Sequence, residues 1–204
     1  MGKNNGLIVM SEVVKVKKLK VAWGITGAGD KIAEIVEVMK ELKKQSEEAV
    51  DIDVYISKAA DTMLKFYRLD EEVKKSFSKV MVEVNANSPF LAGWMQNGKY
   101  EFLLIAPASS NTVAKIVNSI SDTMLTNAAI MSLKAFRTVY ILPTDYKESV
   151  VYTKLPNGKE MKLRVRKQEA DQVRKLESME DVHVLENPQK MREVFLEWVK
   201  TFRA

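Results

Sequence analysis

The sequence predicts an α/β fold in which a doubly wound, mostly parallel sheet is covered by helices on both faces. Short apolar runs alternate with amphipathic segments, two runs end at a proline, and small or hydroxyl-bearing residues follow several of them. This alternation is typical of parallel sheets, because parallel strands need long, usually helical, crossovers. The chain has 204 residues, which is enough for one such domain.

The first part of the chain predicts two strands and two helices. Residues 19–25 (LKVAWGI) are an apolar run that suits a buried strand. Asp30 is expected to cap the next helix, because its side chain can accept from first-turn amides. A second strand is expected over 52–57 and a helix over 59–67, whereas residues 69–85 are ambiguous, with a short strand near 80–84. The apolar residues at helical spacing in the first helix are Ile32, Ile35, Val36, Met39 and Leu42.

The middle of the chain contains the strongest predicted strand. Residues 102–106 (FLLIA) are uniformly apolar and are followed by Pro107, which is expected to end the strand. A further strand over 138–142 is expected to end in the same way, at Pro143. The helices expected between these two strands are 111–119 and 122–136.

The last part of the chain predicts a β-hairpin inserted into the α/β body. Pro156-Asn157-Gly158 separates two strand-like segments, 150–154 and 160–165, and Asn-Gly favours a two-residue hairpin turn. The expected insertion spans about 149–166. The remaining elements are expected to be a helix over 168–179, a strand over 182–185 and a helix from Pro188 to about 202. The predicted organisation is an N-terminal extension, 1–18, followed by one domain, 19–204.

Composition excludes several kinds of chemistry. The chain has no cysteine, which rules out disulfides, thiolate nucleophiles and an iron–sulfur cluster held by its own thiolates. With His183 as the single histidine, no metal site is predicted. No apolar run approaches a membrane span and no secretory signal is recognisable, so a cytoplasmic protein without a membrane partner is expected. The net charge of +5 comes without a nucleic-acid-binding motif, so nucleic acid is not an expected partner.

Three loops are candidates for a ligand site, because open parallel sheets bind ligands at the carboxyl ends of their strands. They are residues 24–30, 57–60 and 107–112. In the first loop, glycines permit close backbone approach, and the helix start offers amides to a phosphate. A tight turn explains these glycines equally well. A dinucleotide is disfavoured, because Ile32 stands where the third fingerprint glycine belongs and Ser57 stands where an acid would hold the ribose.

The other two loops carry hydroxyl groups. Ser57 can cap the helix that follows it, which is the favoured explanation, or donate to the phosphate that the first loop faces. The small residues of the third loop can let a planar ligand lie against the backbone, while Ser109, Asn111 and Thr112 bond its edge. Capping can explain any one of these three residues alone, but a run of all of them favours a ligand.

The third loop and the helix after it carry a resemblance to a known family. Ala106-Pro107-Ala108-Ser109-Ser110-Asn111-Thr112, continued by Ile120-Ser121-Asp122, is similar to the Pro-Ala-Ser-Ala-Asn-Thr signature of the homo-oligomeric flavin-containing cysteine decarboxylase superfamily. Residues 24–28 (GITGA) and Ser57 fall where that superfamily binds FMN. The resemblance covers about residues 19–145. It implies a flavodoxin-like or Rossmann-like three-layer sheet, FMN as cofactor, and trimers or multiples of trimers with flavin near the subunit interface.

The resemblance also implies the residues that bind FMN. Thr26, Gly27, Ala28 and Ser57 are the phosphate candidates, and Ala108, Ser109, Asn111 and Thr112 are expected to face the ring. Gly24 and Pro107 complete the expected set.

Other side chains near these motifs are weaker candidates, and no catalytic residue is predicted. Trp94, Tyr146 and Tyr152 are candidates to shield a flavin face, although packing is the favoured explanation for each. Surface cover is the favoured role of Lys115, and Asp122 is as readily a helix cap.

The departures from the superfamily narrow the expected chemistry. Its decarboxylases use a histidine near the flavin and a Pro-x-Met-Asn stretch, whereas this chain has Pro143-Thr144-Asp145-Tyr146 and only the distant His183. Decarboxylation of a cysteine-derived substrate is therefore disfavoured. In residues 23–29 (WGITGAG), 142–145 (LPTD) and 155–158 (LPNG), the chain instead resembles the archaeal flavoprotein branch, which includes archaeoflavoprotein A and dihydromethanopterin-reductase-like proteins.

The resulting expectation is an FMN flavoprotein that accepts electrons from an external carrier, such as ferredoxin, and passes them on. Two alternatives remain open: a flavin-dependent reductase of a pterin-like substrate, and a regulatory subunit that has lost the flavin. Because ferredoxins are usually acidic, a basic patch formed by Lys162, Arg164, Arg166 and Lys167 is expected to steer one.

Overall fold

The structure, a computed structural model, describes residues 18–155 and 157–203. Six parallel strands form one sheet in the order β3-β2-β1-β4-β5-β8. The order reverses at β1, as in the Rossmann-type doubly wound sheet. Residues 1–17 of the expected extension, and Pro156 of the expected turn, lie outside the described residues. The strands are β1 (Leu19–Ile25), β2 (Val50–Ile56), β3 (Val80–Val82), β4 (Leu103–Ala108), β5 (Val139–Pro143) and β8 (Val182–Val184).

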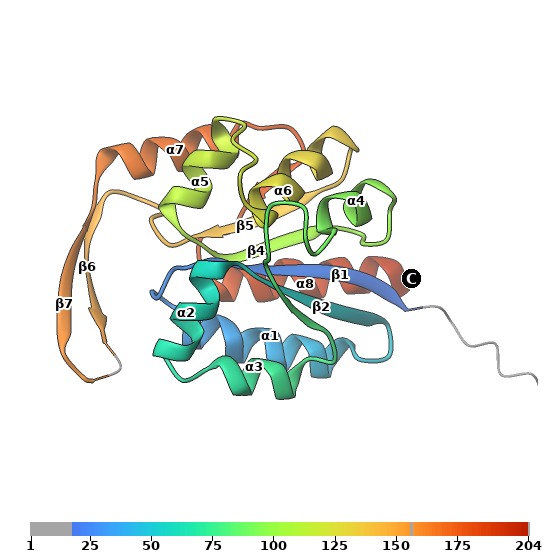
Figure 1. Ribbon diagram of the computed structural model, residues 1–204, viewed down its shortest axis with the longest axis horizontal. Coiled ribbons are helices and arrows are strands. Elements are labelled where there is room, and N and C mark those ends of the chain that lie inside the picture. The colour runs from blue at the N-terminus through green and yellow to red at the C-terminus, as the bar shows by residue number, and fades with distance from the viewer. Residues whose placement is uncertain (1–17, 156, 204) are drawn as a thin grey trace, which may run out of the picture.

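Helices cover both faces of the sheet, as the sequence predicts (Figure 1). Each layer has its own apolar core, because the central strands are buried on both sides. One face carries α1 (Ile32–Ser46), α2 (Lys58–Phe66), α3 (Asp70–Ser76) and α8 (Pro188–Arg203). The other face carries α4 (Leu91–Gln96), α5 (Ser110–Val117), α6 (Met124–Lys134) and α7 (Lys167–Glu177).

The predicted hairpin is confirmed as a separate two-stranded sheet of β6 (Ser149–Lys154) and β7 (Glu160–Val165). It projects from the α/β body at the side where α5 and α7 lie (Figure 1). Gly158 in the connection has φ +82°, a left-handed conformation that favours glycine. The backbone N–H of Leu155 donates to the Lys159 carbonyl at 2.9 Å, so the connection is longer than the expected two-residue turn. Tyr152 and Leu163 on the two strands are exposed.

The structure differs from the sequence prediction at two expected helix caps and at one expected strand end. Asp30 does not cap α1: Lys31 is the N-cap residue, with φ +57° and no side-chain cap bond. Thr123, not Asp122, caps α6, because its hydroxyl accepts from the backbone N–H of Thr126. Pro107 lies inside β4 rather than after it, at an irregularity in the pairing of β4 with β5.

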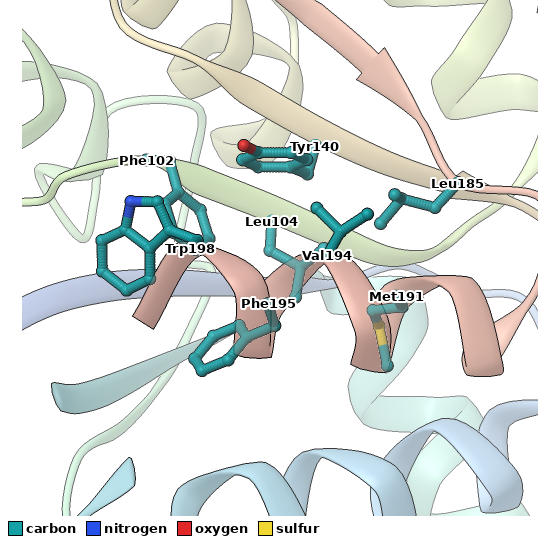
Figure 2. Close-up of a pocket in the computed structure, with 8 residues that line it drawn as sticks. All are labelled: Phe102, Leu104, Tyr140, Leu185, Met191, Val194, Phe195 and Trp198. Carbon is teal, nitrogen blue, oxygen red and sulfur yellow. The ribbon is translucent and has the colours of Figure 1, made fainter. Parts of the chain in front are cut away.

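Helix α8 packs across β4 and β5 and closes the core on its face of the sheet. Figure 2 shows Phe195 and Trp198 of α8 near Phe102, with Tyr140 of β5 above them in this view. The gap among these side chains has a volume of about 10 Å³ and an entirely apolar lining, roughly the space of one water-sized sphere. It is therefore a packing defect of the core and is far too small for a cofactor.

No helix in residues 18–155 and 157–203 combines the length and the apolar character needed to cross a bilayer.

Candidate functional site

The three predicted loops meet in one pocket at the carboxyl edge of the sheet. Its volume is about 560 Å³, within the range of sites for cofactor-sized ligands. The loop after β1 contributes Thr26 and Gly27, the loop after β2 contributes Ser57, and the loop after β4 contributes Ser109 and its neighbours. The pocket therefore lies beside β1, where the strand order reverses, as expected for this class of sheet.

Thr26 ties the first loop to the third. Its hydroxyl donates to the carbonyl oxygen of Pro107 at 2.8 Å and accepts from the backbone N–H of Ser109, also at 2.8 Å. The backbone N–H of Thr26 donates to the same Pro107 carbonyl at 3.2 Å. The Thr26 side chain is 3% exposed, so these bonds are shielded from water. Thr26 therefore sets the separation of two walls of the pocket.

Replacing Thr26 with valine tests this tie. Thr26→Val keeps the shape but removes both side-chain bonds and leaves the half-buried N–H of Ser109 without its partner. We expect the free energy of unfolding to fall by about 2 kcal/mol. Urea denaturation of the apoprotein measures this change. Thr62→Val is the control, because the exposed Thr62 hydroxyl makes one 3.5 Å bond within α2. A loss below about 0.5 kcal/mol for Thr26→Val would contradict the assigned role.

Gly27 places the first loop against α2. A Cβ atom at this position would lie 2.5 Å from the Cβ of Ala59 and 3.2 Å from the Ala59 carbonyl carbon. Only glycine allows this approach without a shift of the backbone. The glycine therefore has a packing reason beyond that of a tight turn, and the approach brings the first two loops together.

Two predicted hydroxyl residues cap helices at the pocket. The Ser57 oxygen accepts from the backbone N–H of Ala60 at 3.1 Å, and the Ser109 oxygen accepts from that of Thr112 at 3.3 Å. The capping explanation is thus confirmed for both residues. Capping uses each oxygen as an acceptor, so the Ser57 hydroxyl hydrogen stays available to a ligand. Asn111, in the first turn of α5, is exposed and also lines the pocket.

Three helices, α2, α5 and α6, begin at this pocket. Each N-terminal turn has backbone N–H groups without partners inside the helix and carries the positive end of the helix dipole. An anionic group such as a phosphate is favoured at such ends. The pocket thus combines anion-binding backbone with the hydroxyl hydrogen of Ser57 and the exposed side-chain amide of Asn111, and these features fit FMN.

Four of the predicted residues lie behind the pocket wall. Ala28, Pro107 and Ala108 are buried, and Gly24 lies in β1, where a Cβ would meet Leu125 at 2.7 Å. Leu125 itself lines the pocket. These residues therefore shape the wall through their small size. Direct contact of any of the ten predicted residues with a cofactor stays a prediction.

The segment after β3 forms a wall that the sequence did not indicate. Glu83, Asn85 and Ala86 line the pocket, and they fall in or next to the ambiguous region. The side-chain amide of Asn127 on α6 donates to the Ala86 carbonyl at 3.0 Å and holds the segment in place. The sequence carried one signal for this wall, a polar residue directly after a possible strand. An ordinary turn shows the same pattern, so the signal does not identify a pocket wall.

The remaining candidates lie at the rim or elsewhere. Asp122 lines the pocket instead of capping α6, and it forms an ion pair with Lys115 at 2.8 Å. Trp94 does not line this pocket: it packs on Tyr55, with the Lys99 ammonium 3.9 Å from its ring centroid.

Two further aromatic candidates and the histidine also lie away from the pocket. Tyr146 and Tyr152 line a different cavity, of about 470 Å³, at the base of the hairpin. His183 lies on β8 and stacks on Tyr140, with ring centroids 5.1 Å apart. In the part of the chain that the structure describes, no histidine, aspartate or glutamate cluster suitable for a metal ion is found.

The stretch after β5 retains an acid near the third loop. Thr144 donates from its backbone N–H to the Ala108 carbonyl at 3.0 Å, which fixes the stretch against β4. Burial raises the pKa of the neighbouring Asp145 above its usual value, and a hydrogen bond with Ser110 partly opposes this. An aspartic acid thus stands where decarboxylases of the resembled superfamily have methionine.

Comparison with known proteins agrees with this geometry. A family model described as Flavoprotein matches residues 10–198. Dihydromethanopterin reductase (acceptor) of Methanocaldococcus jannaschii is 31% identical over 87% of this chain and 96% of its own length. An uncharacterised protein of the same organism is 44% identical over 89% of this chain and 97% of its own length.

Solved structures show the same fold. DmrB of Burkholderia xenovorans in complex with FMN, described as a cubic protein cage for redox transfer, is 29% identical. The match covers 92% of this chain and 98% of that one, with a TM-score of 0.78. The sequence match and the strand-end pocket agree, and the chain belongs to the flavoprotein family.

Proposed function

We propose that this chain is an FMN-dependent reductase that takes electrons from an external donor and passes them to an organic acceptor. The observation that carries the proposal is the convergence of three strand-end loops on one open pocket beside β1. The relatives named dihydromethanopterin reductase support a reductase. They favour the pterin-like substrate over an electron carrier without a substrate of its own.

FMN is the cofactor, and when bound it supplies the electron-transfer chemistry, while the chain supplies position and electrostatics. Gly27 and Ser57 hold the phosphate, through backbone approach and the free hydroxyl hydrogen. Ser109, Asn111 and Thr112 lie along the ring. The Asn111 amide donates to or accepts from the ring edge. The N-terminus of α5 adds a positive dipole end beside these residues.

The electron donor is a separate protein, and an acidic one-electron carrier such as ferredoxin is the candidate. Lys162 and Arg164 on β7 are exposed and carry positive charge. Arg166 and Lys167, however, form ion pairs with Glu169 and Asp171. The basic patch is thus smaller than the sequence suggests. Reduction by ferredoxin should weaken as salt rises, because exposed charges are screened.

The chain acts as a homo-oligomer, a trimer or a multiple of trimers. The DmrB cage supports assembly in a similar protein. Exposed apolar side chains also lie close to the pocket: Val84 is 62% exposed and Ile120 is 45% exposed, each within two residues of a pocket-lining residue. Light scattering should give a mass that is a multiple of three times the 23.2 kDa chain. A monomer at micromolar concentration would contradict this proposal.

FMN titration of the purified protein tests the proposed function. The holoprotein should show the absorption band of oxidised flavin, and the apoprotein should bind one FMN per chain. Anaerobic stopped-flow reduction by ferredoxin and by reduced nicotinamides then identifies the donor class. Saturable reoxidation by a pterin, here dihydromethanopterin, is expected of a reductase, whereas reoxidation by carriers alone would favour the electron-transfer alternative. A chain that binds no FMN would overturn the proposal.

A further inference from the structure

Glu83 is a buried carboxylate in the wall of the FMN pocket. It directly follows β3, and its backbone N–H donates to the Ile56 carbonyl of β2 at 2.8 Å, which fixes its position. The residue is only 9% exposed, yet it lines the pocket near Ser57 and Asn85. Because a buried carboxylate is costly unless hydrogen-bonded, its bonding partners indicate what it does.

The two oxygens of Glu83 accept from the first residues of two different helices. Oε2 accepts from the backbone N–H of Lys58 at 3.0 Å, and Oε1 accepts from that of Met124 at 2.8 Å. Lys58 begins α2 and Met124 begins α6. First-turn amides have no partner inside their helix and attract negative groups. The carboxylate therefore occupies two positions that an anionic ligand would otherwise take.

We propose that Glu83 is a positioning residue that directs the FMN phosphate toward Gly27 and Ser57 and makes the bound cofactor harder to reduce. With one amide each of α2 and α6 already engaged, the loop after β1 and the start of α5 remain as anion-binding parts of the pocket, and the proposed function assigns the start of α5 to the ring. The negative charge of Glu83 also opposes the negative charge that the cofactor gains on reduction. This inference rests on the proposed function, namely that the pocket binds FMN.

The variant Glu83→Gln removes this charge and keeps the size of the side chain. Its amide oxygen can still accept from one of the two backbone N–H groups. We expect the ratio of the dissociation constants, oxidised FMN over reduced FMN, to rise about tenfold, which is the effect of removing a unit charge if it lies on the order of 10 Å from the ring at an effective dielectric constant near 20. A tenfold rise corresponds to an increase of about 30 mV in the midpoint potential of a two-electron couple. Anaerobic titrations with oxidised and with dithionite-reduced FMN measure both constants.

A second variant tests the same effect of charge on the ratio even if the Glu83→Gln protein does not fold. Asn85 is an exposed pocket-lining residue whose side-chain oxygen accepts from the Asn87 N–H at 2.9 Å, a bond that aspartate preserves. Asn85→Asp adds a negative charge and should lower the same ratio about threefold. Asp51→Asn, at the end of β2 opposite to Ser57, changes an exposed acid paired with Lys18, removes a charge at a distance and should leave the ratio unchanged.

The outcomes separate the two proposals. Equal weakening of oxidised and reduced FMN by Glu83→Gln, with the ratio unchanged, would show a purely structural role and overturn the inference. An unchanged ratio in Asn85→Asp would also contradict it. Failure of the wild-type chain to bind FMN would instead overturn the proposed function, and the inference with it.

Discussion

Replacing Gly27 with alanine should weaken FMN binding about 100-fold. The added Cβ would stand 2.5 Å from the Cβ of Ala59, so the loop after β1 must move away from α2. The phosphate position that we propose lies between these two segments, and hydrogen bonds to a charged group contribute about 1.5–3 kcal/mol each. Loss of one or two such bonds gives the expected factor. Fluorescence titration of FMN with the apoprotein measures the dissociation constant.

A compensating change distinguishes this clash from a general loss of stability. Ala59→Gly removes the atom that the new Cβ would meet, so the double variant Gly27→Ala/Ala59→Gly should regain much of the lost affinity. Ala59→Gly alone should change FMN affinity by less than about threefold, because the glycine mainly costs about 1 kcal/mol of helix propensity. If Gly27→Ala bound FMN as tightly as the wild type, the assignment of the phosphate to this loop would be wrong.

The second large effect concerns a buried network of polar side chains centred on β2, the strand that leads into the loop at Ser57. Asp53 of β2 is 4% exposed, and its Oδ2 accepts from the Tyr100 hydroxyl at 2.6 Å and from Lys79 at 2.8 Å. The Tyr100 hydroxyl also bonds that of Tyr55, and burial raises the pKa of both tyrosines. The network joins β2 to the starts of β3 and β4.

Asp53→Ala should lower the free energy of unfolding by about 3–4 kcal/mol. The substitution leaves the buried Tyr100 hydroxyl without its acceptor and the partly exposed Lys79 without its counter-ion, and the loss of two hydrogen bonds to a buried carboxylate is strongly destabilising. Urea denaturation of the FMN-free protein gives the value. Asp51→Ala, two residues earlier on β2, is the matched control, because the exposed Asp51–Lys18 pair should contribute less than about 0.5 kcal/mol. A loss of under 1 kcal/mol for Asp53→Ala would contradict this account.

The sheet was predictable because its strands are buried on both faces. Such strands appear as continuous apolar runs, and β1, β4 and β5 lie within about two residues of their predicted positions. Helix α3 was missed because its seven residues, DEEVKKS, include only one buried apolar position, Val73. Helix α4 was missed because it is short and contains Gly93, which packs under Phe90.

The site was partly predictable for a geometric reason. The carboxyl-edge rule identified the loops after β1, β2 and β4 without any structure, and these loops do meet. The rule says nothing about the segment after β3, because β3 was itself uncertain. The bonds of Glu83 depend on α6, 41 residues further along the chain, and no local pattern shows such a partner.

A crystal structure of this chain with FMN tests the central claim most directly. We predict the phosphate beside Gly27 and Ser57 and the ring along Ser109, Asn111 and Thr112, with Glu83 still bonded to the amides of Lys58 and Met124. FMN bound at the base of the hairpin, near Tyr146 and Tyr152, would contradict the account, as would a phosphate on the amides that Glu83 occupies.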